Sequence, residues 1–166
     1  MSEKRFSIPE DFNVQERSER AMSYFKSGYN CCQSVVLAFS DVVDADKNTL
    51  AVLTSGLGAG MGRMREVCGC VTGMSILAGF MSPADDPTIK TDRTANYALV
   101  KELADVYREE NGSIVCKELL GLAPMSTTPM SSSEPSDRTP EYYKKRPCVK
   151  LVGMAAEIVA NKMLEL

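Results

Sequence analysis

Residues 92–110, DRTANYALVKELADVYREE, have a clear amphipathic helical pattern. Charged side chains occupy one side of this stretch, and Gly112 follows it as a helix stop. The apolar side chains recur at intervals of three or four residues, as on one stripe of an α-helix. They are Ala95, Leu99, Leu103 and Val106. The stretch therefore predicts a long amphipathic helix that packs one face on a core.

Helical spacing continues on both sides of this stretch, and helix-favouring residues outnumber clusters that favour strands. The expected helical segments, the short one at 113–121 included, cover residues 14–26, 30–43, 46–56, 66–81, 92–110, 113–121 and 146–166. In the 66–81 segment, Gly73 and Gly79 are expected to permit close helix packing. We therefore expect an all-α fold, a compact bundle of about five to six helices. Residues 1–166 are expected to form a single domain.

Two segments are too irregular in composition for stable helix. Residues 56–64, GLGAGMGRM, are rich in glycine and predict a connector. Residues 124–140, PMSTTPMSSSEPSDRTP, are rich in Ser, Thr and Pro and predict a long mobile loop.

Charge and hydropathy argue against several classes of partner. The 19 basic and 22 acidic residues are mixed along the chain, so no basic patch for nucleic acid or an anionic membrane is expected. No apolar run reaches the roughly 20 residues that span a bilayer. The first residues also lack the apolar core of a signal peptide, so we expect no membrane insertion and a cytoplasmic location.

The chain has six cysteines and no histidine. The absence of histidine excludes Cys-His and Ser-His catalysis and every zinc site that mixes His with Cys. In a cytoplasmic protein, six cysteines favour reduced thiols that bind metal or perform redox chemistry over structural disulfides.

The cysteines all fall in the first turns of predicted helices: Cys31 and Cys32, Cys68 and Cys70, Cys116, and Cys148. A helix N-terminus carries unpaired N–H groups and a partial positive charge, and both lower the pKa of a thiol. One such cysteine is more often a small core residue. Four coincident helix starts favour functional thiols.

Local sequence supports these positions. Asn30 is expected to cap the helix of Cys31, and Ser113 to cap the turn of Cys116. Pro147 suits a first helical position, which places Cys148 just inside its helix.

Basic residues lie next to two of the cysteine positions. Arg63 and Arg65 precede Cys68, and Lys145 and Arg146 precede Cys148. Basic side chains that point inward would lower the pKa of these thiols further.

Cys68 and Cys70 stand two residues apart, which on a helix corresponds to about 200°. We therefore expect one of them to face the site and the other to face the core or a neighbouring helix. A disulfide partner is expected to come from a different helix.

The glycine run before Cys68 has two open interpretations. Glycines at alternate positions that lead into a helix suit an anion-binding nest made of Gly58, Gly60, Gly62 and Arg63. The alternative is a connector that lets two helices approach closely. The run matches neither the dinucleotide fingerprint nor the P-loop.

These motifs resemble a family of redox-active proteins named for its cysteine pattern C-GCAxxG-C-C. The resemblance extends from SGYNCCQSV through GLGAGMGRMREVCGCVTG and CKELLG to RPCVKLV. By this resemblance the family cysteines are Cys31 or Cys32, Cys68 or Cys70, Cys116, and Cys148. GCVTG, residues 69–73, is one residue shorter than GCAxxG, and Val71 replaces its alanine. The resemblance implies a small helical protein with a redox role.

Three functions stay open. The leading hypothesis is a thiol-based redox protein with a thiol–disulfide or electron-transfer role, in which Cys68 attacks and Cys31, Cys116 or Cys148 resolves the intermediate. Glu66 is the nearest candidate proton donor, on position alone. The alternative is a zinc or iron–sulfur protein with Cys31, Cys68, Cys116 and Cys148 as ligands. The third is a helical interaction module with incidental cysteines.

The sequence identifies neither the redox partner nor the small-molecule substrate. It leaves open whether the protein is an oxidoreductase, whether it holds a cofactor and whether it forms a homodimer.

Overall fold

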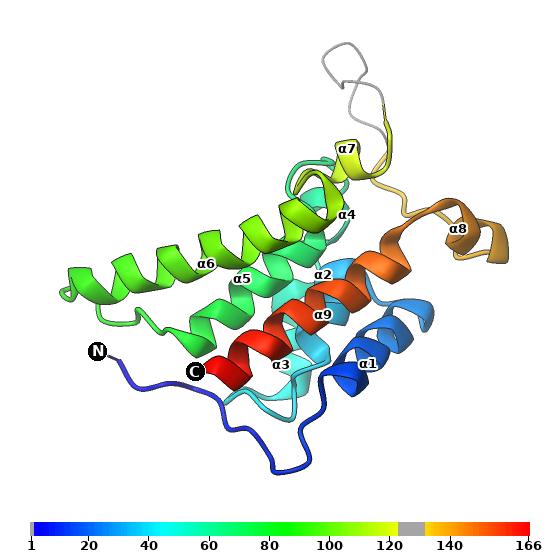
Figure 1. Ribbon diagram of the computed structural model, residues 1–166. Coiled ribbons are helices and arrows are strands. Elements are labelled where there is room, and N and C mark those ends of the chain that lie inside the picture. The colour runs from blue at the N-terminus through cyan, green and yellow to red at the C-terminus, as the bar shows by residue number, and fades with distance from the viewer. Residues whose placement is uncertain (1, 123–131) are drawn as a thin grey trace.

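The computed structural model describes residues 2–122 and 132–166 (Figure 1). In these residues the regular structure is helical, which confirms the all-α prediction, and six of the helices have seven residues or more. The helices are α1 (Val14–Lys26), α2 (Cys31–Leu37), α3 (Lys47–Thr54), α4 (Gly58–Met61), α5 (Gly69–Met81), α6 (Lys90–Asn111), α7 (Cys116–Leu119), α8 (Pro140–Lys145) and α9 (Cys148–Glu165).

Several helices begin and end where the sequence indicates. Asn13 accepts a hydrogen bond from the N–H of Glu16 at the start of α1, and Asp46 caps α3 through two N–H groups. Gly112 ends α6 in the left-handed conformation. These caps satisfy backbone groups that the helix ends would otherwise leave without partners.

The buried face of α6 differs from the predicted one. Leu99 and Leu103 are buried as expected, but Ala95 and Val106 are exposed. The stripe instead continues through Ala104 and Tyr107. Burying the ring of Tyr107 removes more apolar area from water than burying Val106 would, so the helix turns that side inward.

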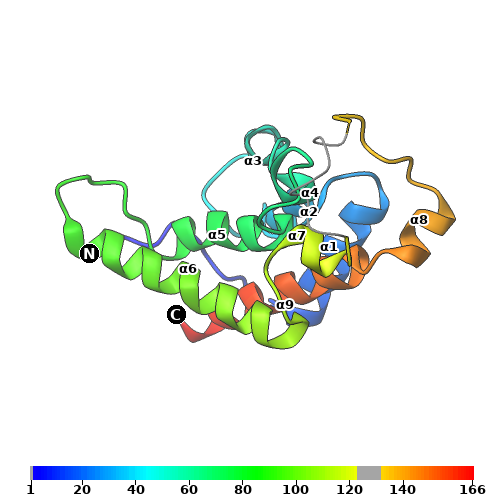
Figure 2. The same cartoon turned by 90° about the horizontal axis from the view of Figure 1, so that it is seen from above.

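The core lies where α1, α2, α5, α6 and α9 pack together. α1 lies along α9, and α2 contacts α1, α3 and α5. α5 in turn packs between α2, α6 and α9 (Figures 1 and 2). Fully buried side chains from several helices fill the core; among the largest are Tyr107, Phe39, Leu37, Leu50, Met74 and Leu77.

The two glycines of α5 have different roles. A Cβ at Gly73 would lie 3.1 Å from the Val35 Cβ, so this glycine permits the close packing of α5 on α2 that the sequence predicts. A Cβ at Gly79 would meet nothing within 4 Å, so the same prediction is wrong for Gly79. Gly79 lies on the exposed side of the helix.

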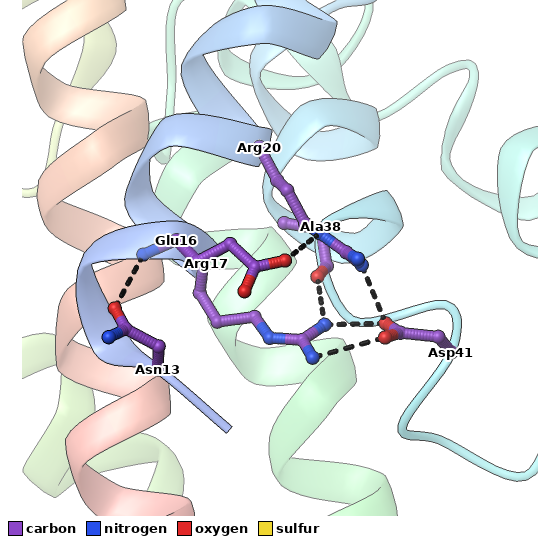
Figure 3. Close-up of polar contacts among 6 residues, drawn as sticks. All are labelled: Asn13, Glu16, Arg17, Arg20, Ala38 and Asp41. Atoms are coloured by element: carbon purple, nitrogen blue, oxygen red, sulfur yellow. Dashed lines mark hydrogen bonds and ion pairs between the residues drawn. The ribbon is translucent and has the colours of Figure 1, made fainter. Parts of the chain in front are cut away.

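A buried arginine joins α1 to the segment that follows α2 (Figure 3). The guanidinium of Arg17 donates to the carbonyl of Ala38 over 2.9 Å and to Asp41 Oδ2 over 3.0 Å. Arg20 also reaches Asp41, at 3.1 Å. Because Arg17 is 3% exposed, its charge is stabilised inside the protein by this carboxylate.

The arrangement of the helices gathers several ends in one place. α4, α7, the start of α5 and the end of α6 lie at the end of the molecule opposite the two chain termini (Figures 1 and 2). Among the described residues, every helix is too short or too polar to cross a bilayer.

The loop predicted at 124–140 lies partly outside the described residues, which exclude 123–131. Residues 132–139 have no regular secondary structure, and α8 begins at Pro140.

Candidate functional site: a pocket of cysteines and arginines

Five of the six cysteines line one pocket of about 320 Å³. Its walls come from the starts of α2, α5, α7 and α9, from the glycine-rich segment, and from residues 133–138. The cysteines are Cys31, Cys68, Cys70, Cys116 and Cys148. Cys32 is fully buried outside the pocket and faces Thr72. The volume is within the range of small-molecule sites.

Each cysteine lies at a helix start, as the sequence predicts. Cys31 begins α2, which has a capping box in which Asn30 and Gln33 exchange hydrogen bonds between side chain and backbone. Cys116 begins α7, and Cys148 begins α9 directly after Pro147. Pro147 is the N-cap of α9 rather than its first residue.

Ser113 does not cap α7. The N-cap is Val115, and Ser113 Oγ accepts a hydrogen bond from the N–H of Val115. The same hydroxyl also contacts the carboxylate of Glu118.

Backbone pairing brings Cys68 close to Cys116. Val67 and Val115 form an isolated antiparallel bridge, in which the Cys68 N–H donates to Ile114 over 2.8 Å and the Cys116 N–H donates to Glu66 over 2.6 Å. This pairing holds residues before Gly69 out of the helix, so α5 begins three residues later than predicted. Cys68 is consequently the N-cap.

The glycine-rich segment forms a left-handed turn that includes the short element α4, in which Ala59 and Gly60 have non-helical backbone angles. Residues 59–63 all have positive φ, and the non-glycine residues among them and Arg65 have φ between 56° and 67°. Each left-handed non-glycine residue costs about 1–2 kcal/mol. Gly60 is fixed by close approach, since a Cβ there would lie 2.6 Å from the Arg65 Cα. The turn directs both Arg63 and Arg65 to the pocket wall.

The segment also packs directly on the start of α2. A Cβ at Gly58 would lie 2.4 Å from the Asn30 side chain, and one at Gly69 would lie 2.4 Å from the Cys31 sulfur. The N–H of Gly62 donates to the carbonyl of Gly56, so it is not free for an anion. These contacts favour the close-approach interpretation of the glycines over the nest.

Cys68 is the one thiol of the six whose pKa is lowered. Hydrogen bonding from the Cys70 thiol is the largest cause, and the Tyr107 hydroxyl, 3.4 Å from the sulfur, is another. The N–H groups of Cys70 and Val71 at the start of α5 add to the effect, although neither makes a capping hydrogen bond of ordinary geometry. These donors outweigh burial and lower the pKa of Cys68 to about 6.

The prediction that a helix start lowers the thiol pKa is wrong at the other positions. Burial raises the pKa of Cys31 to about 12 and that of Cys148 to about 11. It also raises the pKa of Cys116, although Nη1 of Arg65 lies 3.8 Å from that sulfur. At these positions burial raises the pKa of the thiol by more than the helix start and the nearby arginines lower it.

The expectation that Cys68 and Cys70 face different ways is also wrong. Both line the pocket, and their side chains interact. The 200° separation applies to two residues within a helix, whereas Cys68 has φ −54° and ψ 134° at the N-cap. The pKa of Cys70 is raised well above the ordinary value, and the largest cause is the interaction of Cys70 with Cys68.

Four arginines line the pocket: Arg63, Arg65, Arg138 and Arg146. No aspartate or glutamate is among the described lining residues. Arg138 donates to the carbonyls of Phe25 and Tyr29, and the guanidinium of Arg146 lies over the ring of Tyr142. The pocket is thus strongly positive, in a chain whose net charge is −3.

Glu66 and Lys145, two charged residues that lie near cysteines in the sequence, do not line the pocket. Glu66 is exposed and pairs with Lys117 at 3.6 Å, so it does not face Cys68. Lys145 is exposed and pairs with Glu141.

The alternative hypothesis makes four cysteines of this pocket the ligands of a metal or cluster. Within residues 2–122 and 132–166, no three of the His, Cys, Asp and Glu side chains are arranged to hold a metal ion. All six cysteines are free thiols.

Sequence reasoning missed two contributors to this site, Tyr107 and Arg138, and it left open whether Arg65 points inward. Tyr107 follows Leu103 by one helical turn, and this spacing could have identified it. The glycine-rich segment gave no signal that Arg65 would be buried. Arg138 lies in the irregular segment after residue 131, where periodicity carries no information.

Comparison with known proteins supports the redox interpretation of these cysteines. Residues 29–162 match the model of the family described as "Putative redox-active protein (C_GCAxxG_C_C)". No curated protein matches the chain, and no solved structure matches it. The matched range contains every cysteine and all four arginines of the pocket.

Proposed function

Because this chain belongs to the C_GCAxxG_C_C family, whose description is redox activity, we propose that it is a thiol-based redox protein. In this proposal the Cys68 thiolate attacks a disulfide, and Cys70 resolves the mixed disulfide that results. The single observation that carries the proposal is the lowered pKa of Cys68 inside a pocket, beside a second thiol. A thiolate is the nucleophile in thiol–disulfide exchange.

The first step forms a bond between Cys68 and one sulfur of the substrate disulfide and releases the other sulfur as a thiolate. The negative charge thereby leaves Cys68. The hydrogen bond from Cys70 and the hydroxyl of Tyr107 fix the Cys68 thiolate before it attacks. The N-terminus of α5 favours the same charge.

The second step follows from what raises the pKa of Cys70. Its hydrogen bond to Cys68 is the largest cause, burial is the next, and the negative charge of Cys68 is the third. The first and third causes vanish once Cys68 is in a mixed disulfide. Cys70 then gives its proton to the released thiolate and attacks the Cys68 sulfur, which expels the second substrate thiolate. The substrate gains two electrons, and a Cys68–Cys70 disulfide forms.

The test is to mix the reduced protein with a small disulfide and to map the products by mass spectrometry. We expect an intramolecular disulfide between Cys68 and Cys70 in the wild type and a stable mixed disulfide on Cys68 in Cys70→Ser. Cys32→Ser is the control, because Cys32 lies outside the pocket. A disulfide from Cys68 to Cys31, Cys116 or Cys148 would assign resolution to another helix. Absence of any adduct on Cys68 would overturn the proposal.

A further inference from the structure

The charge of the pocket points to the class of substrate. We infer that the site selects disulfides of small thiols that carry an anionic group, and that Arg63 and Arg65 bind this group. The inference rests on the proposed thiol–disulfide function and extends it from the chemistry of the cysteines to the identity of the partner.

The first observation is an excess of positive charge. Four guanidinium groups line the pocket, and among the described lining residues the one group that is ionised with a negative charge near neutral pH is the Cys68 thiolate. None of the four arginines forms an ion pair with a carboxylate of the residues that the structure describes. By contrast, Arg5, Arg17, Arg20 and Arg108 all have acidic partners.

The second observation is that the guanidinium groups of Arg138 and Arg146 contact other parts of the protein, whereas those of Arg63 and Arg65 have unused hydrogen-bond donors. Arg138 is held by two backbone carbonyls, at 3.0 and 3.1 Å, and its guanidinium lies over the ring of Phe25. Arg146 lies over Tyr142. These two side chains fix the segment that borders the pocket and contribute charge.

Arg63 and Arg65 have hydrogen-bonding capacity that the described residues do not use. Nε of Arg63 is buried and has no partner among these residues. Arg65 is 6% exposed, and the one hydrogen bond that its side chain makes to a described residue goes to the Cys116 sulfur at 3.8 Å. A buried guanidinium without a carboxylate partner destabilises the protein. A carboxylate or phosphate ligand would offset this destabilisation through paired N–H···O bonds.

The third observation is the backbone that carries this pair. Arg63 and Arg65 have φ of 66° and 59° and stand in a strained left-handed turn. Backbone strain at a ligand site is maintained where it positions a functional group. The same pocket has apolar walls from Phe25, Leu119 and Leu151. The chemistry that fits is a short apolar chain with an anionic end and a disulfide within reach of Cys68.

The substrate step balances as in the proposed function. An anionic disulfide takes two electrons from Cys68 and Cys70, and both of its halves leave as thiols or thiolates. The guanidinium groups bind the anionic end and are not changed by the reaction. Their effect is on the rate, since a cleft lined by one sign of charge concentrates ligands of the opposite sign.

The experiment compares three small disulfides of similar size and different charge: dithiodipropionate, hydroxyethyl disulfide and cystamine. The full-length reduced protein is mixed with each, and release of the small thiol is followed by chromatography. We expect dithiodipropionate to react about tenfold faster than cystamine or more, with hydroxyethyl disulfide between them. Added salt should slow dithiodipropionate and leave hydroxyethyl disulfide unchanged.

The decisive variants are Arg63→Gln and Arg65→Gln. We expect the rate ratio of dithiodipropionate to cystamine to fall in both variants, and to fall furthest when they are combined. This ratio is unaffected by any change in the pKa of Cys68, because both reagents meet the same thiolate. Arg65→Lys should retain more of the ratio than Arg65→Gln. Arg108→Gln, an exposed arginine paired with Asp105, is the matched control and should leave the ratio unchanged.

Two results would overturn the inference: a wild-type ratio near one, or a ratio that survives the loss of both arginines. Either would leave the thiol–disulfide function intact. No reaction with any of the three reagents would instead overturn the proposed function. If the double variant does not fold, the single variants and the salt dependence of the wild type decide the question.

Discussion

The hydroxyl of Tyr107 lies 3.4 Å from the sulfur of Cys68, in a buried contact between α6 and the start of α5. Cys68 has a lowered pKa, so the hydroxyl is the donor when the thiolate is present. Tyr107 keeps its proton because burial raises its own pKa far above the ordinary value, and the negative charge of Cys68 raises it further. Tyr107 therefore stays protonated and donates a hydrogen bond to the Cys68 thiolate.

Removal of this hydroxyl should raise the pKa of Cys68. In Tyr107→Phe the ring still fills the core, but the thiolate loses one of its donors. We expect the pKa of Cys68 to move from about 6 towards the ordinary thiol value of about 8.5. The pH dependence of thiolate absorbance measures the change. An unchanged midpoint would show that Tyr107 does not stabilise the thiolate.

Gly69 and Gly79 offer a matched pair of substitutions within α5. Gly69→Ala should destabilise the protein by about 1–3 kcal/mol, because the new Cβ would lie 2.4 Å from the Cys31 sulfur. Gly79→Ala, in open space, should stabilise it by about 0.5–1 kcal/mol. Denaturant unfolding of both variants checks the pair. Equal effects of the two substitutions would contradict the packing of Gly69 on Cys31.

The left-handed turn supplies a second pair. Gly60→Ala should cost about 2 kcal/mol or more, because a Cβ would strike the backbone of Arg65 at 2.6 Å in a conformation that disfavours side chains. Met61 is exposed and has φ 67°. Met61→Gly should therefore relieve strain and stabilise the protein by about 1 kcal/mol. Thermal unfolding distinguishes the two, and a destabilised Met61→Gly would show that the turn is not strained there.

Asp41 should contribute stability that depends on pH. Although partial burial raises its pKa, hydrogen bonding and charge from Arg17 more than offset this, and the pKa of Asp41 is lowered. Such a carboxylate stabilises the fold above the ordinary aspartate pKa of about 3.9, and the contribution is lost as the pH falls through the lower folded value. Asp41→Asn should cost about 1–3 kcal/mol near neutral pH, because it leaves the buried guanidinium of Arg17 without its carboxylate, and much less in acid.

The control for Asp41 is Asp105→Asn. Asp105 forms an exposed pair with Arg108 and should contribute less than about 0.5 kcal/mol at any pH. Unfolding of both variants is compared at neutral and acidic pH. A pH-independent loss in Asp41→Asn would argue that the residue acts through packing alone.

The helices were predictable because their causes are local. Apolar spacing identifies α1 and α9, and a single side chain, Asn30, marks the start of α2. Placing the cysteines at helix starts required no more than this. The buried face of α6 was less predictable from the sequence, because the burial of Tyr107 depends on how α6 packs against α5.

The chemistry of the site depends on contacts between segments that are distant in the chain. The pairing of residues near Val67 with those near Val115 makes Cys68 an N-cap and turns it towards Cys70. Whether a thiol is acidic depends on the balance between such donors and burial. Nothing in the sequence around Cys31 or Cys148 reveals that burial prevails there.

The decisive measurement is the alkylation rate of each cysteine as a function of pH, followed by mass spectrometry of peptides. We expect Cys68 to react first, with a rate that rises about a midpoint near pH 6, because its pKa is lowered to about 6. Cys31 and Cys148 should react later and at much higher pH. A midpoint for Cys68 at or above the ordinary thiol value of about 8.5, or faster modification of another cysteine at neutral pH, would show that Cys68 is not the activated thiol.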